Sequence, residues 1–365
     1  MTLVSNSSNP SSKTIVLAIS SLRIGGAEQF VITLAKSFKH LGHNVHILLL
    51  HPEIELPIPA DIPVHVFPYD TYRKIPRFMR KRLIAKALDN FMLKHMGTPD
   101  LVLSNLKSID QFLAYSQLAA VYLVVHNTLS KLHSLSSRSL KQLKEIYLAK
   151  PCIGVSHGVT LDLPILLEHS LDITTIYDPV DIEKAQRLAD EFVPPYQNYL
   201  VNVSTFKMAK RHDILIEAYV KSKLDCPLVL VGDGVERTVC ERMVNKLDIA
   251  DRVHFIGMTD NPYPYIKYAT AMVISSDFEG LNIAMLEALA LNTPVISTAC
   301  PSGPPEVLPD HNLVAVGDTG ALAQKMQQAT NDPAAFTMAL DDKFYPDYAA
   351  MRYLALLEHT ACTAD

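Results

Sequence analysis

Two carboxylates and a glycine-containing turn lie close together between residues 276 and 290. Glu279 and Glu287 are separated by seven residues, and an apolar, helix-like run lies between them. The start of a helix exposes free backbone N–H groups and the positive end of the helix dipole, which suit a phosphate. A carboxylate has only acceptor oxygens, which suit the paired hydroxyls of a ribose or a hexose. The segment therefore outlines a nucleotide-sugar site.

A second segment, over residues 203–213, follows an expected strand and leads into an expected helix. It contains Ser204, Thr205, Lys210 and Arg211. The two basic side chains can neutralise a diphosphate where no metal ion does. Taken alone, such a pair is more often part of a solvated surface, so the assignment depends on its context.

Three further segments each offer a candidate and an ordinary alternative. His126 ends an apolar strand and would face a ligand, although a lone histidine is more often structural. Gly25 and Gly26 follow the first expected strand; paired glycines let backbone approach a ligand closely, or simply form a tight turn. Residues 300–306 contain three prolines and a glycine, which indicate a rigid loop or no more than a turn.

Composition excludes several classes of site and of protein. Hydrophobic residues make up 48% and charged residues 19% of the 365 residues, and the net charge is −5, so the chain is globular and is not a nucleic-acid binder. No Asp-x-Asp, zinc-type cluster or phosphate-binding Gly-Lys loop occurs, so neither a metal nor another cofactor is expected. The five cysteines are scattered, which predicts reduced thiols in a cytoplasmic protein.

Strand-like and helix-like runs alternate in two series, which predicts an α/β protein with two doubly wound parallel sheets. The first series of expected strands covers residues 14–20, 45–50, 64–67, 101–104, 121–126 and 152–156. The second covers residues 200–203, 227–231, 253–256, 272–275 and 295–297. We expect a disordered tail over residues 1–13, a first domain over 14–190, a proline-containing linker over 191–198 and a second domain over 199–340. Ligands of such sheets bind beyond the carboxyl ends of the strands.

A basic stretch interrupts this otherwise acidic chain between residues 71 and 95. Apolar residues recur there at helical spacing, and the basic residues of the stretch are Arg73, Lys74, Arg77, Arg80, Lys81, Arg82 and Lys86. A basic amphipathic helix can lie on an anionic membrane or bind a lipid pyrophosphate. The equally weighted alternative is a helix that covers its own sheet and exposes a solvated basic face.

Together these segments resemble glycosyltransferase family 4, the retaining enzymes of the GT-B fold, in which two Rossmann-like domains face each other across a cleft. The resemblance covers nearly the whole chain after residue 13 and is strongest over residues 275–308. There the two glutamates, Ala288-Leu289-Ala290, Thr293-Pro294-Val295-Ile296 and Ser302-Gly303 match in order. Weaker matches include Gly25-Gly26-Ala27-Glu28 and residues 176–181.

The resemblance implies a role for each candidate. Glu287 would bind the ribose, Glu279 the donor sugar, and Lys210 the leaving diphosphate, while His126 would lie near the reacting carbon. The N–H groups that would meet the diphosphate are those of Leu281, Asn282 and Ile283, after the turn at Gly280. Gly26, with Gly25, would let the acceptor-side loop close, and Gly257 and Met258 would lie by the base. Residues 341–365 would form a helix that crosses back to the first, acceptor-binding domain.

One departure from the family concerns Ser204 and Thr205, where its members usually carry Gly-Arg. The missing arginine leaves Lys210 with less help on the phosphates, unless Arg211, Lys207 or a weaker hydrogen bond from Thr205 replaces it. Loss of a charged contact would cost about 1.5–3 kcal/mol. This departure favours the alternative of a degenerate protein that binds nucleotide or lipid without turnover.

The resemblance implies a metal-independent, retaining transfer of a sugar from a nucleotide-sugar donor, with UDP as the expected nucleotide. The acceptor would be a glycan or lipid-linked sugar in surface polysaccharide or lipopolysaccharide synthesis, at the inner face of the cytoplasmic membrane. A nucleotide-sugar 2-epimerase of related architecture is a further alternative, which would need acid and base carboxylates in the cleft.

Overall fold

The structure, a computed structural model, describes residues 12–72, 75–132 and 136–361. The predicted tail lies outside these ranges except for its last two residues. The chain divides into two compact units: the first comprises residues 1–125, 141–153 and 350–365, and the second comprises residues 126–140 and 154–349. The predicted linker over 191–198 lies within the second unit, and its role as a domain boundary stays a prediction.

The first sheet has seven strands in the order β3-β2-β1-β4-β5-β6-β7. Their bounds are β1 (Thr14–Ile19), β2 (Asn44–Leu49), β3 (Val64–Val66), β4 (Leu101–Asn105), β5 (Val121–Val125), β6 (Cys152–Gly154) and β7 (Ile173–Thr175). The strands β1 to β5 pair in parallel. Aliphatic residues fill β1 and β5, and nearly all are buried, as expected of strands that are covered on both faces.

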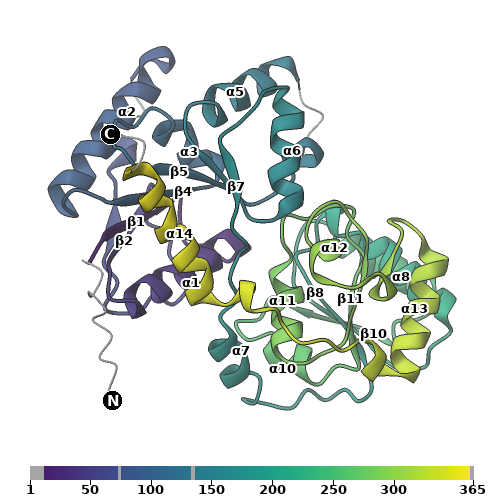
Figure 1. The fold of residues 1–365 in the computed structure, drawn as a ribbon. Helices are drawn as coiled ribbons and strands as arrows, with labels where there is room; N and C mark the ends of the chain where they lie inside the picture. The colour runs from purple at the N-terminus through teal and green to yellow at the C-terminus, as the bar shows by residue number, and fades with distance from the viewer. Residues whose placement is uncertain (1–11, 73–74, 133–135, 362–365) are drawn as a thin grey trace, which may run out of the picture. The chain divides into compact units, whose positions relative to one another are not determined.

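Helices connect and cover these strands (Figure 1). They are α1 (Gly26–His40), α2 (Arg77–His95), α3 (Lys107–Leu113), α4 (Leu129–Leu132), α5 (Ser137–Tyr147) and α6 (His157–Leu167), with a short 3-10 helix η1 (Tyr69–Tyr72). Helix α7 (Ile182–Leu188) follows β7 and contacts helices of the second unit instead. The basic helix α2 buries Ile84, Leu88 and Met92 in the core of the first unit. This helix therefore covers its own sheet, as one of the two readings of the basic stretch predicted.

The second sheet has six parallel strands in the order β10-β9-β8-β11-β12-β13. Their bounds are β8 (Leu200–Val203), β9 (Leu228–Val231), β10 (Val253–Gly257), β11 (Ala271–Ile274), β12 (Val295–Thr298) and β13 (Leu313–Val314). The strand order reverses between β8 and β11. The loops that leave the carboxyl ends of these two strands are therefore the expected position of a ligand.

The helices of the second sheet are α8 (His212–Ser222), α9 (Arg237–Lys246), α10 (Tyr263–Lys267), α11 (Ile283–Ala290), α12 (Pro304–Val307) and α13 (Thr319–Asn331). Short 3-10 turns complete the connections: η2 (Met208–Lys210), η3 (Asp310–Asn312), η4 (Pro333–Phe336) and η5 (Asp342–Phe344). Every strand expected from the sequence is present, with ends that differ by at most two residues. The short elements β7, β13 and α10 were not expected.

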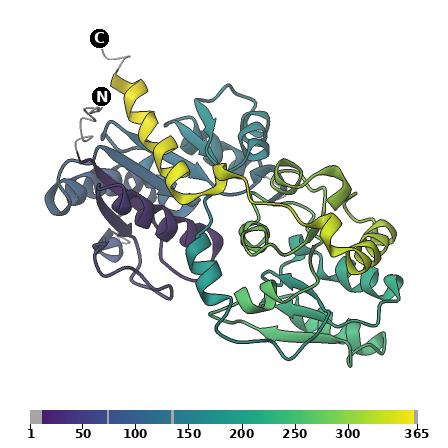
Figure 2. The ribbon, with the colours of Figure 1, turned by 60° about the horizontal axis from the view of Figure 1, so that its bottom comes forward.

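The last helix, α14 (Pro346–Ala361), begins in the second unit and belongs to the first unit from Ala350 onward. Within the first unit Tyr353 meets Phe30 and Phe38 of α1 edge to face, at ring-centroid distances of 6.3 and 6.4 Å. Figure 1 and Figure 2 both show α14, in yellow, beside α1, in purple. No helix that the described residues form is both long and apolar enough for a membrane span.

Candidate functional site

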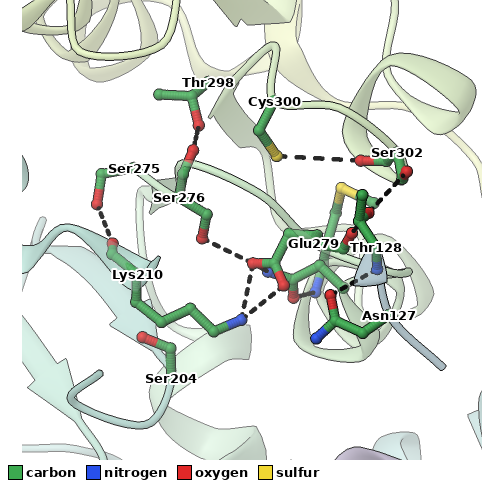
Figure 3. A network of polar contacts seen from close by, with 12 residues as sticks. Asn127, Thr128, Ser204, Lys210, Ser275, Ser276, Glu279, Thr298, Cys300 and Ser302 are labelled. Carbon is green, nitrogen blue, oxygen red and sulfur yellow. Dashed lines mark hydrogen bonds and ion pairs between the residues drawn. The ribbon is translucent and has the colours of Figure 1, made fainter. Parts of the chain in front are cut away.

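The two loops at the strand-order reversal bring Lys210 and Glu279 into direct contact (Figure 3). The Lys210 ammonium donates to both carboxylate oxygens of Glu279, each at 2.7 Å. Ser276 and Asn282 donate to Oε1 of the same carboxylate at 2.7 and 2.9 Å. Glu279 is only 6% exposed, so its charge depends on these donors. Two residues that the sequence marked separately thus form one ion pair.

The backbone around this ion pair is also held. Ser275 donates to the carbonyl oxygens of Lys210 and Arg211, at 2.8 and 3.0 Å, and Thr298 donates to that of Ser276 at 2.6 Å. The N–H of Asp277 bonds the Ala209 carbonyl at 2.8 Å. Two loops far apart in sequence are therefore fixed against each other, which gives the ion pair a defined position.

The helix that follows the turn, α11, begins at Ile283 and has Asn282 as its N-cap. The Asn282 side chain accepts from the N–H of Met285 at 3.0 Å, so it satisfies one of the free donors of the first turn. Among the described residues, no acceptor binds the backbone N–H groups of Leu281, Asn282 or Ile283. These donors, at the positive end of α11, suit an anion.

Residues 126–128 of the second unit lie directly on this turn. A Cβ atom at Gly280 would lie 2.0 Å from the carbonyl oxygen of His126, so only glycine permits this approach. The Thr128 hydroxyl donates to the carbonyl oxygen of Glu279 at 2.6 Å and lies 3.1 Å from the hydroxyl of Ser302. The sequence marked His126 and Gly280 but not Thr128, because a threonine after a strand carries no distinctive signal.

His126 has a buried acidic neighbour. Its Nδ1 lies 3.7 Å from Oδ2 of Asp178, and both side chains are less than 10% exposed. Burial raises the pKa of the Asp178 carboxyl, while His126 opposes that shift. The histidine is thus oriented within the second unit by a residue that the sequence had marked only as part of a weaker family match.

Glu287 lies apart from the ion pair, on the second turn of α11. The Tyr263 hydroxyl donates to its Oε1 at 3.0 Å. Burial raises the pKa of Glu287 to about 7, whereas Tyr263 and the nearby Lys184 act in the opposite direction. The carboxylate to which the family resemblance gives ribose binding therefore has a tyrosine and a lysine beside it, which the sequence did not reveal.

Arg211, one of the three possible substitutes for the missing arginine, is already bound by carboxylates. Its Nε and Nη2 donate to Asp213, and its Nη1 donates to Asp277, all at 3.0 Å at their shortest. A phosphate would have to compete with both aspartates. Lys207 is exposed on the same loop.

The hydroxyl of Ser204 takes part in a network of hydrogen bonds inside the protein. Its hydroxyl donates to Asn202 Oδ1 at 2.7 Å and lies 3.1 Å from Nε2 of His212, whose ring stacks on Phe206. Burial, helped by Lys210, lowers the pKa of His212 to about 4. The neighbouring Thr205 makes no side-chain hydrogen bond among the described residues.

Two glycines that the sequence analysis did not single out, Gly232 and Gly234, shape the loop after β9. Cβ atoms at Gly232 and Gly234 would lie 2.1 and 2.5 Å from the carbonyl oxygens of Ser204 and Phe206, and both glycines have positive φ. A Gly-Asp-Gly run after a strand was a visible signal of this close approach. The predicted base-side residue Gly257 ends β10 and accepts from the N–H of Gly232 at 2.9 Å, while Met258 beyond it is 51% exposed.

The rigid loop over residues 300–306 binds the start of α6. The Glu306 carboxylate accepts from the N–H groups of His157 and Gly158 at 2.7 and 2.8 Å. A side chain at Gly158 would collide with Ser302. The loop is therefore an anchor within the second unit and more than a plain turn.

The remaining candidates belong to the first unit. Gly25 directly precedes α1 and Gly26 begins it. In the basic stretch, Arg80 donates to the Ile75 carbonyl, Lys81 pairs with Glu145 at 2.8 Å, and the Arg82 guanidinium lies over the ring of Tyr115. Lys86 is exposed. Arg73 and Lys74 lie outside the described residues, as does the side chain of Arg77.

The chain is similar to known glycosyltransferases. The family model described as glycosyl transferases group 1 matches residues 184–344. The chain is 30% identical over 190 residues to N-acetyl-alpha-D-glucosaminyl L-malate synthase of Bacillus anthracis, which covers 49% of this chain and 50% of that protein. It is 28% identical over 176 residues to a Campylobacter jejuni enzyme named N-acetylgalactosamine-N,N'-diacetylbacillosaminyl-diphospho-undecaprenol 4-alpha-N-acetylgalactosaminyltransferase, covering 47% of this chain and 46% of that one.

The alignments span about half the length of these curated relatives. The crystal structure of Anabaena HepE in complex with UDP superposes with a TM-score of 0.70 at 17% identity, over 96% of this chain and 99% of that chain, and this likeness shows a shared fold. Residues 184–344, which form most of the second unit, thus match the glycosyl transferases group 1 family, and the two parallel sheets with the likeness to HepE give the chain the GT-B fold.

Proposed function

We propose that this protein is a retaining glycosyltransferase that moves a sugar from a nucleotide sugar, with UDP as the nucleotide, to a hydroxyl of a glycan or a lipid-linked acceptor. The observation that carries the proposal is the contact of Lys210 with Glu279 beside the N-terminus of α11. One cation, one carboxylate and a set of free N–H groups stand together where the strand order reverses. HepE, of the same fold, binds UDP in its crystal structure.

The proposed chemistry needs positive charge at the leaving group. When the bond from the sugar to the diphosphate breaks, the diphosphate gains negative charge and the sugar carbon becomes oxocarbenium-like. Lys210 and the N–H groups of α11 would stabilise that charge without reorganising solvent. No metal ion is required in this scheme. Glu279 would then be free to accept hydrogen bonds from sugar hydroxyls, as a binding group and not as a nucleophile.

The acceptor side of the proposal rests on helix α2. Four of its exposed residues, Met79, Arg82, Leu83 and Lys86, share one face at helical spacing, two of them apolar and two basic. Such a face suits the surface of an anionic membrane or a lipid pyrophosphate. A lipid-linked acceptor is also named for the Campylobacter jejuni relative. Peripheral attachment to the cytoplasmic membrane is part of this proposal.

Flotation with liposomes tests the membrane proposal directly. Arg82→Glu with Lys86→Glu is expected to abolish co-flotation with vesicles rich in anionic lipid. Exchange of two other exposed basic residues, Lys207 and Lys246, for glutamate keeps the same net charge and serves as the matched control. Equal flotation of wild type and the α2 variant would refute the membrane proposal.

A second function is favoured by the state of Arg211. Two carboxylates bind its guanidinium, and Ser204-Thr205 supplies no arginine, so the cation that contacts Glu279 at the turn is Lys210. A protein so equipped can bind a nucleotide sugar without cleaving it. Turnover distinguishes this binding protein from the proposed enzyme.

The experiment is thermal unfolding with UDP, GDP, ADP and CMP, each with and without EDTA, followed by release of nucleoside diphosphate from the matching nucleotide sugars. A ligand at about 100 times its Kd stabilises a protein by about 2.7 kcal/mol. Stabilisation by UDP that EDTA leaves unchanged, together with turnover, is the expected result. Stabilisation without turnover would favour the binding protein. If no nucleotide stabilises the protein, the proposed donor site is refuted.

A further inference from the structure

The hydrogen bond from Tyr263 to Glu287 has no counterpart among the roles that the family resemblance assigned. Tyr263 begins the short helix α10 and is 2% exposed, while Glu287 lies on α11 with a half-buried side chain. The donor and acceptor oxygens are 3.0 Å apart. Burying a phenol completely requires a partner for its hydroxyl, and this carboxylate is that partner.

The two oxygens of Glu287 differ in their surroundings. Oε1 accepts from Tyr263, whereas Oε2 accepts no hydrogen bond from any described residue. Glu279 differs, because both of its oxygens are occupied. A carboxylate that is held through one oxygen and open at the other has a fixed orientation toward an incoming pair of hydroxyls.

A third residue supports the tyrosine. The Lys184 ammonium, on α7, lies 5.7 Å from the centre of the Tyr263 ring, the distance of a cation–π contact. Three helices, α7, α10 and α11, thus contribute Lys184, Tyr263 and Glu287 in turn. The titratable or charged groups that act on Glu287 from these helices are Tyr263, Lys184 and Asp181, the N-cap of α7.

We propose that Tyr263 is a positioning residue of the donor site: it fixes the Glu287 carboxylate, with Lys184 behind it, so that the site selects a ribonucleotide over a 2′-deoxyribonucleotide. The inference rests on the proposed function, because it takes Glu287 as the ribose-binding group. Tyr263 itself acts only through Glu287.

The same arrangement sets how nucleotide binding depends on pH. The pKa of Glu287 is raised to about 7, and the ionised form accepts hydroxyl hydrogen bonds from both groups of a ribose. Affinity is therefore expected to rise as the pH increases through about 7. Removing the Tyr263 hydroxyl or the Lys184 charge removes a contribution that lowers this pKa, so either change moves the midpoint of the rise to higher pH.

The test is calorimetric titration of the full chain with UDP and with 2′-deoxy-UDP, and in parallel with GDP and 2′-deoxy-GDP, between pH 5.5 and 8.5. Wild type is expected to prefer the ribonucleotide by about tenfold at pH 8, the effect of about one hydrogen bond to a charged group. In Tyr263→Phe the preference is expected to fall below about threefold, with the midpoint shifted upward and the thermal unfolding temperature little changed.

Tyr265→Phe is the matched control. Tyr265 lies on the same helix, and its hydroxyl bonds to no described residue. This control should retain the wild-type preference. Lys184→Met is the second variant, compared with Lys246→Met at an exposed site of α9, and it should raise the pH midpoint even if Tyr263→Phe is poorly folded.

The outcomes separate the inference from the proposed function. A wild type that binds no nucleotide refutes the proposed function, and the inference falls with it. If wild type prefers the ribonucleotide and Tyr263→Phe shows the same preference and pH midpoint, the donor site stands and the role of Tyr263 is refuted. If Tyr263→Phe is unfolded, Lys184→Met decides instead. An unchanged pH midpoint of nucleotide affinity in that variant refutes the proposed positioning of Glu287.

Discussion

Lys210 and Glu279 bind each other, with the ammonium 2.7 Å from both carboxylate oxygens. Family resemblance gave these residues different ligands, the diphosphate and the sugar. In the structure the charged group of each side chain is bound by the other side chain. A nucleotide-sugar donor must therefore replace this ion pair with its own contacts. A buried ion pair loses much of its Coulomb energy to desolvation, which makes such an exchange feasible.

The exchange predicts opposite effects on binding and turnover in Glu279→Gln. The neutral amide holds Lys210 less strongly, so UDP without a sugar is expected to bind several-fold more tightly, a gain of about 1 kcal/mol. Transfer should nevertheless fall by roughly tenfold or more, because the sugar hydroxyls lose a charged acceptor. Calorimetry and steady-state kinetics measure the two effects. Glu217→Gln, at an exposed site of α8, is the control, and weaker UDP binding in Glu279→Gln would contradict the exchange.

Gly280 predicts a steric effect at the turn. In Gly280→Ala the new Cβ would lie 2.0 Å from the carbonyl oxygen of His126, so backbone must move. We expect a loss of about 1–3 kcal/mol in stability and a larger loss of activity. Gly320→Ala, within α13 with its nearest neighbour at 3.4 Å, is the control and should stabilise its helix slightly. Thermal unfolding compares the two, and equal unfolding temperatures would show that the turn relaxes freely.

The raised pKa of Glu287 predicts that this carboxyl group makes the stability of the folded protein depend on pH. Its pKa in the folded protein, about 7, lies above the ordinary value of 4.5, so the folded state favours the protonated form. The stability that this provides is complete below about pH 4.5 and is lost as the pH rises through 7. Glu287→Gln is therefore expected to be more stable than wild type by about 2 kcal/mol at pH 8, with little difference at pH 5. Thermal unfolding at the two pH values measures it, and an equal difference at both would contradict the prediction.

His212 predicts the opposite dependence. Burial lowers its pKa in the folded protein to about 4, below the ordinary 6.5. Its contribution is therefore complete above pH 6.5 and is lost as the pH falls toward 4, by up to about 3 kcal/mol. In His212→Gln this acid-dependent loss should disappear. His311→Gln, at an exposed site, is the control and should keep the wild-type dependence of stability on pH. Thermal unfolding between pH 4 and pH 7 measures both variants. An unchanged dependence in His212→Gln would contradict the prediction.

Much of the fold was predictable because local patterns determine it. Buried aliphatic runs alternate with helices, and parallel strands that are covered on both faces need such runs. The presence of α11 followed from the apolar, helix-like run between Glu279 and Glu287. Short elements such as β13, which has two residues, carry too few residues for a pattern.

The amino-acid sequence sets which residue types are available at the carboxyl ends of β8 and β11: lysines, a glutamate, and a glycine small enough for a close backbone approach. Only the tertiary structure decided their partners. Lys210 and Glu279 are 69 residues apart, Tyr263 and Glu287 are 24 apart, and Arg211 is bound by Asp277 across 66 residues. Such pairs depend on which strands neighbour each other in the sheet, and strand order arises from packing over the whole chain and not from spacing along it.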